Sequence, residues 1–95
     1  MIFREVIWKQ EFVEKLATKH GVTVWEVEDV FDSRPHVRLA EKGNVAGENV
    51  YAAYGQTAGG RYLVIYFIYK SAGRVLPISA RDMEDNERRY YAKRK

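Results

Sequence analysis

The sequence contains no cysteine, and this absence excludes several classes of protein. Without thiols the chain can form no disulfide, can use no thiolate nucleophile and lacks the ligands of the usual structural zinc sites. The longest apolar run, residues 62–69, has the length of a strand and is far too short to cross a bilayer. Arg4, Glu5 and Lys9 interrupt the apolar residues near the start, so no secretory signal peptide is indicated. We therefore expect a cytoplasmic protein.

The rest of the composition is that of one small folded domain. The chain has 95 residues, of which 46% are apolar and 31% charged, a balance typical of soluble globular proteins. A chain of this length can build only one limited core. We expect a single α+β domain that occupies residues 1–95.

The net charge of +3 is unevenly distributed. Residues 1–33 contain four Lys or Arg and seven Asp or Glu, a balance of −3, whereas residues 34–95 contain twelve and six, a balance of +6. Clustered basic side chains displace counterions from phosphates, so this asymmetry indicates a polyanion partner. A merely solubilising surface is the alternative, and charge alone does not decide between them.

Two helices are predicted near the N-terminus. Apolar side chains recur every four residues from Trp8 to His20, which is the spacing of one helical stripe, and Gly21 ends that helix. Thr23 and Glu26 then form the reciprocal capping box that begins a second helix. Because only a residue or two separates them, the helices are expected to form a hairpin or corner.

Strands dominate the rest of the chain. Alternation and turn residues predict strands at residues 36–41, 50–57, 61–70 and 75–80, after a short N-terminal strand at 2–8. The glycine-containing segment 40–49 is the loop expected to be most flexible. The other connections are short, which favours antiparallel pairing of successive strands.

The C-terminal region is predicted to pass from a strand into a third helix. Pro77 cannot donate to a ladder, so the last strand should be at an edge or bulged there. The helix is expected from about Met83 to Tyr91, with Asp82 as its cap. The predicted fold is α+β, an antiparallel sheet of about four strands with two N-terminal helices and one C-terminal helix.

Three segments together resemble a known family. These are "KHG" with "VTVWEVEDVF", then "YGQTAGGRYLVIYF", then "GRVLPISARDMEDNERRYY", and together they are similar to the BrnT family of type II toxins, whose fold is RelE-like. The "ISAR…ER..Y" ending is the most specific part, because five positions keep their spacing across a strand-to-helix junction. The resemblance covers nearly the whole chain.

The resemblance implies a function and partners. Members are metal-independent endoribonucleases that cut RNA and inhibit growth, and they need no cofactor. The implied partner is a BrnA-like antitoxin with a ribbon-helix-helix domain, which binds operator DNA with the toxin; a heterotetramer of the two is expected. One departure is Leu76, where family members commonly have a basic residue; its role could shift to Arg74. A non-catalytic module that binds the antitoxin or RNA is the alternative function.

Cutting RNA without a metal requires a base for the 2′-hydroxyl proton, cations for the charge on phosphorus and an acid for the departing 5′-oxygen. His20, beside Lys19 in "KHG", is the implied proton carrier. A helix-ending residue that packs on the apolar stripe or bonds a terminal carbonyl is its alternative. His36 matches no motif and is expected to be an ordinary strand residue.

Arg61 and Arg81 are the predicted phosphate-binding cations. Arg61 opens the central strand after a Gly-Gly turn, and Arg81 directly precedes the predicted helix cap, where N–H groups favour anions. For Arg81, a salt bridge to Glu87 or Asp85 is an equally supported interpretation. Arg74 is a weaker third cation, because turn arginines are usually solvated.

The last helix carries the remaining candidates. Glu87 is either the general base or a half-buried partner for an arginine. Tyr91 or Tyr90 either relays protons and stacks on bases or packs against the sheet. Arg88 and Arg89 are further RNA-binding candidates.

The central strand is apolar on both faces. One face must meet the helices, while the other, which carries Tyr66, is suited to stack bases or to bury a helix of the partner. Glu28 and Asp32 share a helical face but have no histidine near them, so no metal site is predicted.

Overall fold

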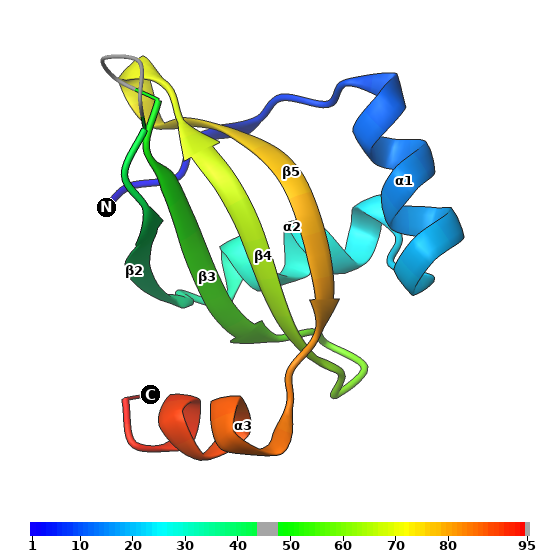
Figure 1. Ribbon diagram of the computed structural model, residues 1–95, viewed down its shortest axis with the longest axis vertical. Helices are drawn as coiled ribbons and strands as arrows, with labels where there is room; N and C mark the ends of the chain where they lie inside the picture. The colour runs from blue at the N-terminus through cyan, green and yellow to red at the C-terminus, as the bar shows by residue number, and fades with distance from the viewer. Residues whose placement is uncertain (44–47, 95) are drawn as a thin grey trace.

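The computed structural model describes residues 1–43 and 48–94 as a twisted sheet with helices packed around it (Figure 1). The elements are β1 Glu5–Val6, α1 Gln10–His20, α2 Val24–Asp32, β2 His36–Glu41, β3 Val50–Gln56, β4 Tyr62–Tyr69, the 3-10 turn Ser71–Gly73, β5 Arg74–Asp82 and α3 Asp85–Ala92. Part of the predicted flexible loop, residues 44–47, lies outside the described residues. In the described ranges, no helix is long and apolar enough to span a membrane.

The predicted corner between the first two helices is confirmed. Gly21 has φ 60°, the left-handed conformation that glycine adopts without strain, and its N–H donates to the carbonyl of Ala17. Thr23 Oγ1 accepts the N–H of Glu26 at 3.2 Å, while Glu26 Oε1 accepts the N–H of Thr23 at 3.0 Å. Local capping chemistry therefore fixes where α1 ends and α2 begins.

The sheet has five strands in the order β1-β5-β4-β3-β2, so the prediction of about four antiparallel strands was incomplete. The pairs from β2 to β5 are antiparallel, as expected, but β1 pairs with β5 in parallel. Only Glu5 and Val6 take part in that pairing, opposite Arg74 and Val75. A contact of two residues leaves too short a pattern in the sequence to reveal its partner.

Pro77 lies at a β-bulge, which confirms its predicted position at an irregular or edge site. Phe67 pairs with Pro77 while its neighbour Tyr66 pairs with Ser79, so Ile78 is an extra residue in β5. Beyond Val75 the outer side of β5 is no longer covered by β1. A proline without an N–H donor is tolerated at such a position.

The two faces of the sheet pack against different helices. α2 passes behind the sheet and α1 lies beside β5 (Figure 1). Their shared core consists of Leu16, Val22, Val27, Val30, Phe31, Ala53, Leu63, Ile65, Phe67, Val75 and Ala80. α3 covers one end of the opposite face with a second cluster of Ala52, Tyr54, Val64, Met83 and Tyr91. Among the described residues, no helix covers the remainder of that second face.

The predicted start of the third helix was wrong. β5 continues through Asp82, and α3 begins at Asp85 with Glu84 as its N-cap. Glu84 and Glu87 make the reciprocal capping box there. Asp82 cannot cap the helix because its carboxylate binds Arg61, far away in the sequence.

Candidate functional site

Arg61 is surrounded by acceptors of the protein itself. It donates to the two carboxylate oxygens of Asp82 at 2.7 and 3.1 Å, and to Glu26 at 3.1 Å. The carbonyls of His20 and Gly21 each accept another hydrogen bond at 2.9 Å. All of the five N–H donors of a guanidinium are thereby engaged. We call this group, Arg61 with Glu26, Asp82 and the two carbonyls, the Arg61 latch.

The latch carries one positive and two negative side chains, a balance of −1. Hydrogen bonds from Arg61 hold the pKa of Asp82 below its ordinary value. Burial alone would raise the pKa of Glu26, but hydrogen bonds from Thr23 and Arg61 leave it lowered. Since its surroundings are anionic, this guanidinium is poorly placed to attract a phosphate. Its geometry instead ties the α1–α2 corner to the ends of β4 and β5.

Lys19 and His20, the predicted proton carrier and its neighbour, lie exposed at the end of α1. The imidazole of His20 is therefore not packed on the apolar stripe. Its positive form contributes to the lowered pKa of Asp82, after the larger effect of Arg61. The KHG motif thus stands beside the latch, at the α1 end of the molecule.

Arg81 lies on the other face of the sheet, because neighbouring residues of a strand point to opposite sides. Its terminal nitrogens donate to both carboxylate oxygens of Glu87 at 2.6 and 2.8 Å, and to the hydroxyl of Tyr66 at 3.0 Å. Glu87 Oε1 also accepts the N–H of Glu84. The predicted alternative for Arg81, a salt bridge to Glu87, is confirmed.

Arg81 is less completely bound than Arg61. Among the described residues, no hydrogen bond uses its Nε, and 31% of the side chain is exposed. Its hydrogen bonds to Glu87 hold the pKa of that carboxyl below its ordinary value, so Glu87 is ionised and only weakly basic at neutral pH. The ion pair therefore holds the Arg81 guanidinium at the surface, where its Nε can donate a hydrogen bond to a ligand.

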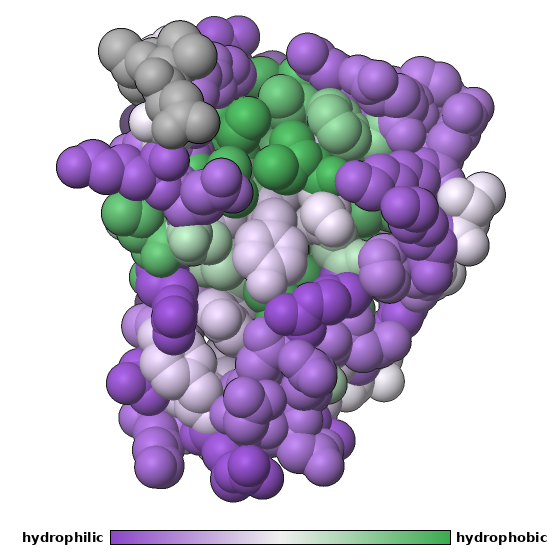
Figure 2. Space-filling view, viewed as in Figure 1, coloured by the Kyte–Doolittle hydropathy of each residue, from purple (hydrophilic) through white to green (hydrophobic). Residues whose placement is uncertain are grey.

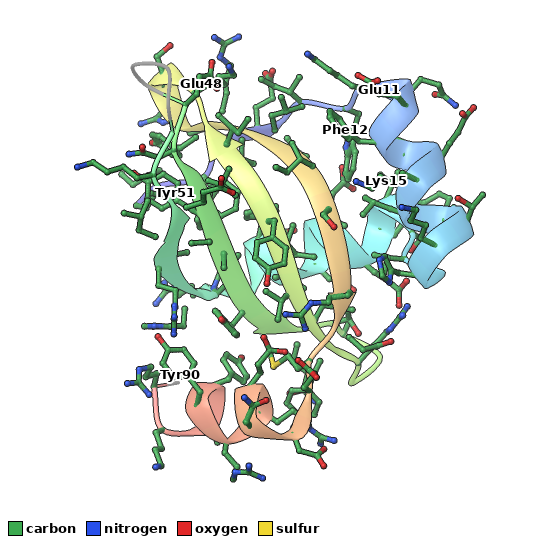
Figure 3. All side chains as sticks on the ribbon, viewed as in Figure 1. Glu11, Phe12, Lys15, Glu48, Tyr51 and Tyr90 are labelled. Carbon is green, nitrogen blue, oxygen red and sulfur yellow. The ribbon has the colours of Figure 1, made fainter. Side chains whose placement is uncertain are left out.

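Residues of β2 join Arg81 on this face. The strand register places His36, Tyr54, Val64 and Arg81 side by side on four successive strands. His36 Nε2 lies 2.8 Å from the hydroxyl of Tyr90. Figure 3 shows Tyr90 projecting from α3 toward this end of β2.

Two further guanidiniums flank Tyr90. Arg94 stacks 3.8 Å from the centre of its ring and Arg38 lies 5.0 Å from it. We call the whole group the basic tyrosine face; its members are His36, Arg38, Tyr54, Tyr66, Arg81, Glu87, Tyr90 and Arg94.

Sequence reasoning missed the β2 part of this face. His36 and Arg38 are two residues apart on a strand, so they share a side, and that spacing was the available signal. Nothing near them in the chain indicates Tyr90, which is 54 residues beyond His36. Only the strand register and the position of α3 bring them together.

The environment of the face changes several proton affinities. Burial lowers the pKa of His36, and the charges of Arg94 and Arg38 lower it further. The Tyr90 hydroxyl raises the pKa of Arg38, while burial raises that of Tyr54. At neutral pH the face therefore combines charged guanidiniums with an uncharged imidazole.

The remaining α3 candidates, Arg88, Arg89 and Tyr91, flank Tyr90 in the same helix but lie toward Tyr62 of β4 instead of toward β2. Arg88 stacks 4.2 Å from the ring centre of Tyr62, and Arg89 is exposed beside it. Together with Tyr91 they line a hollow of about 230 Å³. Tyr91 itself is buried, and burial raises its pKa. Its position is that of a packing residue under the helix.

Arg74 and Leu76 lie toward the opposite end of β5. Arg74 is exposed and donates to the carbonyl of Ser71, and it is about 23 Å from Arg81 along the strand. Leu76 is 5% exposed and sits on the same face as Arg81, opposite Ile68. Figure 2 shows this part of the face as apolar, with polar side chains gathered below it over α3.

The chemistry of the basic tyrosine face is that of anion binding and proton transfer. Arg38 and Arg81 supply cations, phenols supply hydroxyl donors and flat rings, and His36 supplies a neutral nitrogen base. No three His, Asp or Glu residues in the described part of the chain are grouped as metal ligands would be.

A comparison with known protein families identifies one family that matches most of the chain. The family described as "Ribonuclease toxin, BrnT, of type II toxin-antitoxin system" matches residues 8–87, which include both the latch and most of the basic tyrosine face. No curated protein sequence matches the chain. A match over so much of the chain shows the family, and with it an antitoxin partner: the protein belongs to the BrnT ribonuclease toxins of type II toxin–antitoxin systems.

Proposed function

We propose that the protein is a metal-independent endoribonuclease that inhibits growth, and that the basic tyrosine face is where it cuts RNA. The observation that carries this proposal is the charge of the two candidate sites. The basic tyrosine face holds three guanidiniums, Arg38, Arg81 and Arg94, and one carboxylate, Glu87, a balance of +2, whereas the latch has a balance of −1. A phosphate is attracted to the first site and repelled by the second.

In this proposal Arg81 is the main phosphate-binding residue. Its guanidinium is 31% exposed and lies beside the Tyr66 hydroxyl, no hydrogen bond within the described residues uses its Nε, and such a group stabilises the charge that develops on phosphorus. Glu87 acts as a positioning residue, because its carboxylate is occupied by Arg81 and by the N–H of Glu84. Arg88 and Arg89 extend the basic surface along α3 for the RNA backbone.

The latch has a supporting role in the same proposal. Arg61 holds Asp82, the residue next to Arg81, and so fixes the end of β5 that carries the phosphate-binding side chain. Lys19 and His20 lie at the same end of the sheet as Asp82. They would contact RNA only if the bound RNA chain extends around that end of the sheet. Arg74 is the most distant cation and would bind the RNA backbone alone.

We further propose that the antitoxin carries a ribbon-helix-helix domain and that its toxin-binding segment covers the basic tyrosine face. Half-buried Val50, Ile68 and Ile78 border the cations there, so an amphipathic segment with acidic residues fits both parts. RNA and antitoxin would then compete for one surface. Coexpression with a ribbon-helix-helix protein encoded by a neighbouring reading frame should restore growth and displace RNA.

The test of the ribonuclease proposal uses purified protein, mixed-sequence single-stranded RNA and a buffer with excess EDTA. We expect fragments that end in a 2′,3′-cyclic phosphate, and we expect growth arrest on expression. Arg81→Ala should abolish both, while Lys15→Gln, an exposed charge change on α1, should leave both intact. RNA that stays uncut by folded wild-type protein in EDTA contradicts metal-independent cleavage.

A non-catalytic module is the second candidate, and Leu76 favours it. Other members commonly have a basic residue at this position, and here an apolar side chain occupies the same face as Arg81. In that case the protein binds RNA with a steep salt dependence but forms no products, and it still binds the antitoxin.

A further inference from the structure

His36 and Tyr90 form a pair that the family resemblance does not account for. We propose that Tyr90 is a catalytic residue which takes the proton of the attacking 2′-hydroxyl, and that His36 is the group that receives the proton Tyr90 gives up. This inference rests on the proposed ribonuclease function and adds the base that Arg81 and Glu87 do not supply.

The geometry for proton transfer is present. The two side chains come from elements 54 residues apart, yet His36 Nε2 and Tyr90 Oη are 2.8 Å apart, a short hydrogen bond. The rings meet edge to face at 5.3 Å between centres. With the imidazole proton on Nδ1, the Tyr90 hydroxyl donates to Nε2, and the lone pairs of its oxygen are shared between Arg38 and the incoming proton.

The step balances without any added reactant. As the 2′-oxygen forms its bond to phosphorus, its proton passes to Tyr90 Oη and the tyrosine proton passes to His36 Nε2. The bond from phosphorus to the 5′-oxygen breaks, and that oxygen takes a proton from water. The products are a 2′,3′-cyclic phosphate and a free 5′-hydroxyl, with the imidazolium losing its proton to solvent afterwards.

The surroundings keep the imidazole ready to accept a proton. Arg38 faces it from β2, Tyr54 from β3, Tyr90 from α3 and Arg94 from the residues that follow α3. Burial and these two cations place the His36 pKa below its ordinary value of about 6.5. His36 also lines a surface hollow together with Asp32 and Arg34, whose charges are opposite. The uncharged form therefore predominates at neutral pH.

The pair also stands where a phosphate would be held. Arg38 lies near the ring of Tyr90 and, like Tyr66 and Glu87, influences Tyr54, so these groups surround one small area of the sheet. Ala52, at the centre of this area, is paired with both Arg38 and Tyr66 and adds no bulk. A phosphate between Arg38 and Arg81 would bring its neighbouring 2′-hydroxyl toward Tyr90.

The experiment is single-turnover cleavage of mixed-sequence single-stranded RNA in EDTA, measured from pH 5 to 9 for four variants. His36→Gln and Tyr90→Phe should each reduce the rate constant by about 100-fold or more, with RNA affinity unchanged. In wild-type protein the rate should fall as the pH drops through the His36 pKa, below about 6.5, and His36→Gln should lose that dependence. Tyr90→Phe keeps the ring that the two arginines contact, and circular dichroism verifies that each variant is folded.

His20→Gln tests whether the other histidine causes the pH dependence, and Arg81→Ala tests the ribonuclease site independently of the His36–Tyr90 pair. If His20→Gln removes the acidic limb while His36→Gln retains it, or if both pair variants cleave at the wild-type rate, the inference is overturned. Loss of cleavage in Arg81→Ala together with wild-type rates in the pair variants rejects the pair but keeps the proposed ribonuclease. Wild-type protein that never cuts RNA rejects both.

Discussion

Arg81 donates to both carboxylate oxygens of Glu87, and the same carboxylate accepts the N–H that begins α3. One side chain thus joins the end of β5 to the N-terminus of the helix. The pair is half-buried, with 31% of Arg81 and 14% of Glu87 exposed, so its removal affects both the position of Arg81 and the folded state.

Replacing Glu87 by Gln should destabilise the protein by about 1–3 kcal/mol, because Arg81 would lose its charged partner and one of its two carboxylate acceptors, while the amide oxygen can still accept the Glu84 N–H. Urea unfolding measures the change. Asp85→Asn is the matched control, since it removes the same charge from the same first turn but its exposed side chain has no comparable pairing. An equal loss in both variants would show that only helix-dipole charge is involved.

Stability should decrease in acid more steeply in wild-type protein than in Asp82→Asn. The folded pKa of Asp82 is lowered by Arg61, so its contribution is complete above the unfolded value of about 3.9 and is lost as the pH falls through the folded value. Unfolding by urea at pH values from 7 to 3 measures the slope. Parallel curves for the two proteins would contradict this role of the latch.

Arg61→Gln should mainly reduce stability, whereas Arg81→Gln should mainly reduce RNA cleavage. Arg61→Gln should lower the free energy of unfolding by about 2–4 kcal/mol, because Asp82 and Glu26 lose a shared partner, yet it should retain most RNA cleavage at 15 °C. Arg81→Gln should lose cleavage by about 100-fold or more. Denaturation curves and cleavage rates on the same preparations make the comparison. The opposite pattern of activity would put the phosphate site at the latch.

Gly73→Ala should weaken the attachment of β1. Gly73 has φ +77°, and an added Cβ would lie 2.8 Å from Arg4 Cγ and 3.1 Å from the Ile2 carbonyl oxygen. We expect a loss of about 1–3 kcal/mol and faster amide exchange at Ile7, which bonds to β5. Gly59→Ala, whose added Cβ would have only Thr57 Oγ1 at 3.9 Å, is the control. Equal exchange in the two variants would contradict the prediction.

The parts of the fold that depend on neighbouring residues were predictable. Gly21 and the Thr23–Glu26 box specify the helix corner through contacts within a few residues, and alternation or a continuous apolar run between turn residues revealed each long strand. Asp82 looked like a cap for the same local reason, but Arg61 competes for its carboxylate from 21 residues away. A local pattern cannot include such a partner.

The contacts of the candidate site could likewise be predicted only where the residues are close together in the sequence. Arg81 and Glu87 are six residues apart, and the sequence already indicated that they could meet. Arg61 was expected to be a free cation, because its acceptors are brought together only by the packing of α1, α2 and β5. His36 was overlooked because its partner Tyr90 reaches it only through the position of α3.

The extra residue at the bulge, Ile78, also changes how substitutions in this strand should be compared. Positions 76 and 81 differ by an odd number, so strict alternation would separate them, but the bulge reverses the parity and both side chains face the same way. A basic side chain at position 76 would therefore join Arg81 on one surface. Exchange between Leu and Arg at this position alters the charge on the Arg81 side of the sheet by a whole unit and leaves the helix-covered core on the other side untouched.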